Sequence, residues 1–122
     1  MEIETDPPEP PAWFPAEDGS TLGQPGTEGG IILRDDEHPW GARITLERGS
    51  EVVPFAITCG IYGWMMHTCW LPTLGQAERE FAQMRDAISA ILEMIPLSSD
   101  PLADEKMRAA AGAMGRFTLR FP

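Results

Sequence analysis

The chain has 122 residues, of which 43% are hydrophobic and 23% are charged, and its formal net charge is −10. This length and composition are typical of one globular domain with its own core. The negative charge disfavours binding to nucleic acid and to anionic membrane surfaces, because both would repel it. It is compatible with a basic protein partner or a small molecule.

The beginning of the chain and the cysteine content favour a cytoplasmic protein. The first eight residues, Met1 to Pro8, contain neither a basic region nor an apolar segment, so we expect no secretory signal. Cys59 and Cys69 do not form a C-x-x-C pair and are too few for a disulfide framework. We therefore expect a cytoplasmic location and reduced thiols.

Residues 1–29 differ from the rest of the chain in composition. They contain seven acidic residues, six prolines and no basic residue, which predicts an extended acidic arm preceding a domain at 30–122. Trp13 and Phe14 are large aromatic residues within this arm. We expect one of them to dock on the domain or on a neighbouring subunit.

Strand signals dominate residues 30–72. Apolar and polar side chains alternate over residues 40–48, which is typical of a strand with one buried face. The run Asp35-Asp36-Glu37-His38-Pro39 predicts a turn by its composition, and the glycines at 60 and 63 predict either a hairpin turn or a bulged bend. The predicted strands cover residues 30–35, 40–48, 52–60 and 63–71.

The stretch from Val52 to Ala77 contains no Asp, Glu, Lys or Arg and is long enough to span a bilayer. Pro54 and two glycines interrupt it, and Pro72 closes it early. Buried strands also form nearly continuous apolar runs. We therefore interpret the stretch as two buried strands and expect no membrane span.

Helical periodicity follows. Apolar residues recur on one face over residues 74–95, and Thr73 with Gln76 forms a capping box at the start. Residues 101–114 predict a second helix that ends at Gly115. Apolar residues alternate over 116–121, which predicts a final strand.

Segregated strands and helices predict an α+β fold. We expect an antiparallel sheet of four or five strands, with two helices packed on one of its faces and the extended acidic, proline-rich arm at the N-terminus.

Soft ligands and aromatic residues gather in the predicted strand at 63–71. Met65, His67 and Cys69 would share one face of that strand. A His and a Cys or Met in an apolar setting can bind a metal, or haem through an axial ligand. His67, Met65 and Cys69 are therefore candidate cofactor-binding residues, although a lone His in an apolar strand is more often a hydrogen-bonded core residue.

Two other groups could support chemistry. Asp35, Asp36, Glu37 and His38 place three carboxylates beside an imidazole, a pattern that could support acid–base catalysis but is also typical of a solvated turn. Cys59 could act as a nucleophile with His67 as its base, if the break at 60–63 is a hairpin.

Three classes of function follow. The four tryptophans and seven methionines exceed what a small core needs and favour a non-catalytic binding or assembly protein that forms a homo-oligomer, most simply a homodimer. The alternatives are a haem- or metal-binding protein that uses His67, and a small enzyme centred on the acidic cluster or on the Cys59/His67 pair.

Overall fold

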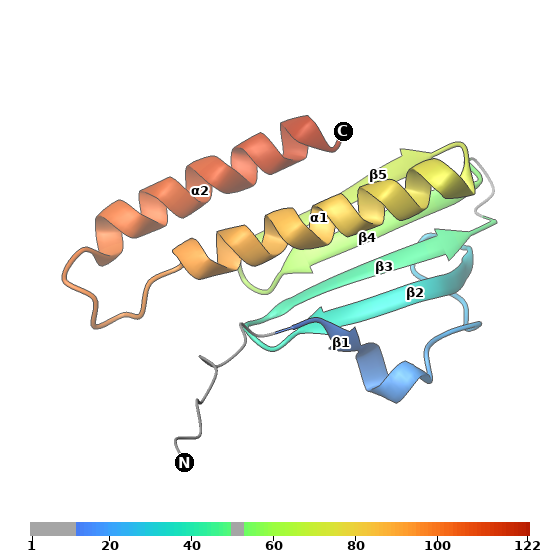
Figure 1. The fold of residues 1–122 in the computed structure, drawn as a ribbon, viewed down its shortest axis with the longest axis horizontal. Helices are drawn as coiled ribbons and strands as arrows, with labels where there is room; N and C mark the ends of the chain where they lie inside the picture. Colours follow the sequence, from blue (N-terminus) through green and yellow to red (C-terminus); the bar gives the residue numbers. More distant parts are fainter. Residues whose placement is uncertain (1–11, 50–52) are drawn as a thin grey trace, which may run out of the picture.

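The computed structural model describes residues 12–49 and 53–122. It contains a five-stranded antiparallel sheet whose strands follow chain order, and two helices on one of its faces (Figure 1). The predicted α+β fold is confirmed. The elements are β1 (Phe14–Pro15), a short 3-10 segment (Ala16–Gly19), β2 (Ile31–His38), β3 (Ala42–Arg48), β4 (Phe55–Ile61), β5 (Met65–Leu71), α1 (Leu74–Met94) and α2 (Ala103–Arg120).

The glycine-rich break between β4 and β5 is a hairpin turn. Ile61 pairs with Met65, and the Trp64 backbone N–H donates to the Ile61 carbonyl at 2.9 Å. Gly63 has a φ of 83°, in the left-handed region that glycine adopts without strain. The pairing continues in regular register to Phe55 and Leu71, so the uncharged stretch forms two neighbouring strands, although Val52 itself lies outside the described residues.

The core lies between α1 and the sheet. Phe81, Met84 and Ile88 of α1 are fully buried against apolar side chains of β3 and β4, as the spacing along residues 74–95 predicts. Thr73 caps α1, because its hydroxyl accepts a hydrogen bond from the Gln76 backbone N–H at 3.2 Å. The second helix, α2, packs mainly on α1, on the side that faces β5 (Figure 1).

The predicted strand at 116–121 is wrong, as is the helix end at Gly115, because α2 continues to Arg120. Helical spacing places Met114, Phe117 and Phe121 on the buried side, whereas Leu119 is 82% exposed. The alternation of apolar and polar residues over 116–121 therefore arises by chance in a segment that is helical. Gly115 lies inside the helix, where glycine is tolerated at a cost of about 1 kcal/mol.

The predicted turn at 35–39 is also wrong for its first four residues, which extend β2 to His38, and of its residues Pro39 alone lies in the turn. Acidic residues usually favour turns, but here the carboxylates have partners along the strand. Asp35 faces Arg43 of β3, and Asp36 accepts a hydrogen bond from Arg85 of α1 at 2.8 Å. The turn itself falls between His38 and Ala42.

The described part of the predicted arm packs against the domain. Trp13 docks on the helix side, where its indole N–H donates to the Ser89 hydroxyl at 2.9 Å and its ring meets His38 edge-on. The following residues cross to the opposite face of the sheet, which we call the outer face. There the Glu47 carboxylate accepts hydrogen bonds from the backbone N–H groups of Glu28 and Gly30. Residues 1–11 lie outside the described part of the chain.

Candidate functional site

His67 lies on β5 and faces the helices, where the sequence pattern places it. Its Nε2 hydrogen-bonds to the backbone carbonyl of Phe121, and its ring meets the Phe117 ring edge-on, with centroids 6.2 Å apart. A carbonyl only accepts, so Nε2 is the donor. While this bond is made, Nε2 has no free lone pair for a haem iron or a metal ion.

The other candidate cofactor ligands share this face of β5. The Cys69 thiol donates to the same Phe121 carbonyl at 3.0 Å, and Met65 is partly buried against the core. Burial, with a smaller contribution from the Glu80 charge, raises the pKa of Cys69 to about 11. Among the described residues, no group of three His, Cys, Asp or Glu side chains could hold a metal ion.

Cys59 and His67 are directly opposite each other in the β4–β5 register. The hairpin therefore brings together the pair that we considered as nucleophile and base. Burial, and to a lesser extent the nearby Cys69, raises the pKa of Cys59 to about 12. The thiol is therefore protonated at neutral pH, which is the opposite of an activated nucleophile.

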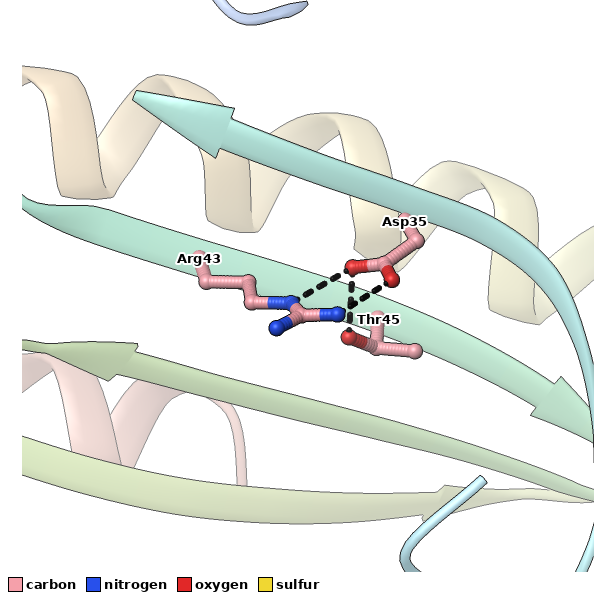
Figure 2. A network of polar contacts seen from close by, with 3 residues as sticks. All are labelled: Asp35, Arg43 and Thr45. Carbon is pink, nitrogen blue, oxygen red and sulfur yellow. Dashed lines mark hydrogen bonds and ion pairs between the residues drawn. The ribbon is translucent and has the colours of Figure 1, made fainter. Parts of the chain in front are cut away.

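The acidic cluster at the end of β2 is split between the two faces of the sheet. Asp35 points to the outer face, where Arg43 binds it through two hydrogen bonds of 2.9 and 2.6 Å and the Thr45 hydroxyl donates a third (Figure 2). Asp36 points to the helices and pairs with Arg85. Successive residues of a strand alternate in direction, so these carboxylates and His38 do not converge on one point.

Asp35 is a buried structural carboxylate. Burial by itself would raise its pKa, but the interactions with neighbouring side chains, chiefly the hydrogen bonds from Arg43, outweigh this effect, and the pKa lies below its ordinary value. The Arg43 guanidinium pairs with the Asp35 carboxylate at 2.6 Å, so the charge of each group is matched by the other. The network therefore stabilises the β2–β3 pair.

The outer face of the sheet has a covered half and an open half. Over β2 and β3, the chain between β1 and β2 covers the face, and Glu47 is fully buried there. Over β5, Met66 and Trp70 are 81% and 44% exposed, and Thr68 lies between them. The open half therefore presents apolar side chains to solvent.

The strand β5 is also an edge of the sheet, because β4 is its sole strand partner in residues 12–49 and 53–122. Every second backbone N–H and C=O of an edge strand points away from the sheet. Exposed edges are usually protected by charged side chains, proline or a bulge. The seven residues of β5 contain neither a charge nor proline, and their register is unbroken. We call this unprotected strand the β5 edge.

A second feature lies at one end of the sheet. A hollow of about 510 Å³ is lined by Trp40, from the β2–β3 turn, by Tyr62 and Trp64, from the β4–β5 turn, and by residues at the end of α1. Sequence reasoning assigned these aromatic residues to no site. Their positions beside Gly41 and Gly63 could have indicated this site, because residues next to turn glycines lie at the end of a sheet.

We found no match to this chain among protein-family models, curated proteins or solved structures. In the part of the chain that the structure describes, neither helix has the combination of length and apolar composition that a membrane crossing requires. Function must therefore be inferred from the geometry.

Proposed function

We propose that this protein is a non-catalytic assembly protein that forms a homodimer through its β5 edge. The observation that carries the proposal is a seven-residue edge strand without charge, proline or bulge. Such an edge is a template for pairing with another strand. Pairing would satisfy the outward backbone groups of β5 and continue the sheet into the partner.

The sequence of β5 suits pairing with itself. In an antiparallel pair with a two-fold axis at Thr68, Met66 of each copy lies opposite Trp70 of the other, and Met65 lies opposite Leu71. Methionine sulfur and aromatic rings attract each other, and paired threonines are favourable across antiparallel strands. Every opposite pair on the outer face is therefore compatible.

Charge also favours a second copy as the occupant of the β5 edge. Each chain carries a net charge of −10, so two copies repel each other over most of their surfaces. The stretch around β5 contains no ionisable Asp, Glu, Lys or Arg side chain. The strand itself therefore places no Asp, Glu, Lys or Arg opposite its copy when two acidic chains pair along it.

The position of α2 leaves room for a partner strand. The Phe121 carbonyl meets the side chains of His67 and Cys69, on either side of Thr68. Phe121 marks the C-terminal end of α2, and the rest of the helix extends away from the arrowhead of β5 (Figure 1). A two-fold axis at Thr68 would therefore place the second helices of the two copies over opposite halves of the paired strands.

Sedimentation velocity over a range of concentrations tests this proposal. We expect a dimer for the native protein and a monomer for Thr68→Lys, which places two like charges together at the two-fold axis. The dissociation constant should rise by about 100-fold or more, since like charges in contact cost several kcal/mol. Met66→Lys should act in the same direction, and the high exposure of Met66 leaves its effect on folding small.

Thr27→Lys is the matched control, because Thr27 is exposed on the covered half of the molecule. It makes the same chemical change and should leave the dimer intact. A native protein that stays monomeric at all concentrations, or a folded Thr68→Lys variant that dimerises as tightly as the native chain, would contradict the proposal.

A further inference from the structure

The hollow at the end of the sheet is assembled from three parts of the chain. The β2–β3 turn provides Trp40, the β4–β5 turn provides Tyr62 and Trp64, and the end of α1 provides Glu93 and the residues that follow it. The three aromatic side chains are 53%, 59% and 55% exposed. Large aromatic residues that gather around a hollow while remaining half in solvent are typical of a binding site rather than of a core.

Hydrogen bonds hold the two turns in place. The Tyr62 backbone N–H donates to the Gly41 carbonyl at 2.9 Å, which joins the β4–β5 turn to the β2–β3 turn. Within the β2–β3 turn, the Trp40 backbone N–H donates to His38 Nδ1 at 3.1 Å. The backbone positions from which the aromatic side chains project are therefore set before any ligand arrives, which lowers the cost of binding.

The electrostatics of the hollow favour a positive charge. Glu93 is the one charged side chain in its lining. The hollow also lies at the C-terminal end of α1, where backbone carbonyls carry partial negative charge. The last turn of α1 contains no basic residue that would offset this charge. Aromatic faces add to the effect, because their quadrupoles attract cations.

The lining also limits the kind of cation. A primary ammonium group carries three N–H donors, each of which needs an acceptor when it leaves water. Beyond Glu93, the lining side chains offer little more than the Tyr62 hydroxyl, so a primary ammonium group would depend on the backbone carbonyls at the end of α1 for its other acceptors. An alkylated ammonium group has no donors to satisfy and presents methyl groups to aromatic rings.

We propose that the hollow formed by Trp40, Tyr62, Trp64 and Glu93 binds a small organic cation with an alkylated ammonium head group. None of these four residues belongs to β5, whose edge carries the proposed dimerisation. Its volume of about 510 Å³ is suitable for a small molecule.

Titration with choline, followed by tryptophan fluorescence and by calorimetry at constant ionic strength, tests the proposal. The matched probe is 3,3-dimethylbutan-1-ol, which has the shape of choline but no charge. We expect saturable binding of choline that is at least about tenfold tighter than binding of the neutral alcohol, as a desolvated cation–π contact predicts. Equal binding of the two probes, or no binding of choline, would overturn the proposal.

Three variants locate the site. Glu93→Gln and Trp64→Leu should each weaken choline binding by about five- to tenfold, through loss of the carboxylate charge and of one aromatic face. Trp70→Leu is the control, because Trp70 is another half-exposed tryptophan that lies on β5, outside the lining. If Trp70→Leu weakens binding as much as Trp64→Leu while both variants keep the native circular dichroism, the hollow is not the site.

Discussion

The sheet has two edges, and the chain builds them differently. The first edge, β1, contributes two residues, ends in Pro15 and is followed by a segment that folds beneath the sheet. The last edge, β5, contributes seven residues with no charge and no proline. Short edges that contain proline resist pairing with other chains, and long regular ones promote it. The comparison indicates that the chain protects one edge and leaves the other available.

The same contrast holds for the two halves of the outer face. Over β2 and β3, two buried carboxylates, Asp35 and Glu47, are satisfied by Arg43 and by backbone N–H groups beneath a covering segment. Over β5, the side chains are Met66, Thr68 and Trp70, which are accessible and uncharged. Charge is therefore placed where the chain itself can neutralise it and is absent where we expect a second copy to bind.

In the covered half of the outer face, the largest loss of stability should come from Glu47→Ala. This variant leaves the backbone N–H groups of Glu28 and Gly30 without their acceptor and leaves a void beneath the covering segment. We expect the free energy of unfolding, measured by urea denaturation, to fall by about 3 kcal/mol. Glu78→Ala, at an exposed position on α1, should change it by less than about 0.5 kcal/mol. Equal effects of the two variants would refute the role of Glu47.

A smaller loss is expected for Asp35→Asn. The variant removes the charge that Arg43 and Thr45 bind, and we expect a loss of about 2 kcal/mol at pH 7. The folded-state pKa of Asp35 lies below its ordinary value of 3.8. Its contribution is therefore present above the unfolded-state pKa and is lost as the pH falls through the folded-state pKa.

Urea denaturation as a function of pH checks this sign. As the pH falls below about 5, the free energy of unfolding should decrease more steeply for the native protein than for Asp35→Asn. The two curves should therefore approach each other at low pH. Parallel curves would show that Asp35 titrates alike in the folded and unfolded chains.

The smallest effect is expected for Ser89→Ala, which removes the acceptor of the Trp13 indole N–H. We expect a loss of about 1 kcal/mol. Hydrogen exchange should become faster for β1 and the adjacent end of β2, while β5 remains unchanged. A uniform acceleration across the sheet would mean that Trp13 stabilises the whole domain rather than the protected edge.

The sequence predicts the elements that have a long, unambiguous period. The apolar face of α1 and the alternation along β3 are examples, because each extends over enough residues to exclude other periods. Residues 116–121 are too few for this, and helical packing of Phe117 and Phe121 prevails. The acidic end of β2 could not be recognised as a strand, because its partner Arg85 lies on a distant helix.

The candidate sites were harder to predict than the fold. The face of His67 follows from strand alternation, but its partner, the Phe121 carbonyl, depends on where α2 ends. The β5 edge is open because residues 116–120 belong to α2. The strand predicted at 116–121 could have paired with β5 and covered this edge. Trp40 and Tyr62 come together because β3 pairs with β4, with Ala42 opposite Ile61, and a backbone hydrogen bond then joins the two turns.

The central claim, that β5 is open in one copy and paired in two, can be measured by residue-resolved hydrogen exchange at different protein concentrations. The account predicts that the outward-pointing amides of β5 exchange rapidly in dilute protein and become protected as the concentration rises. Amides of β2 should show no such dependence. Outward amides of β5 that exchange at the same rate at every concentration would contradict it.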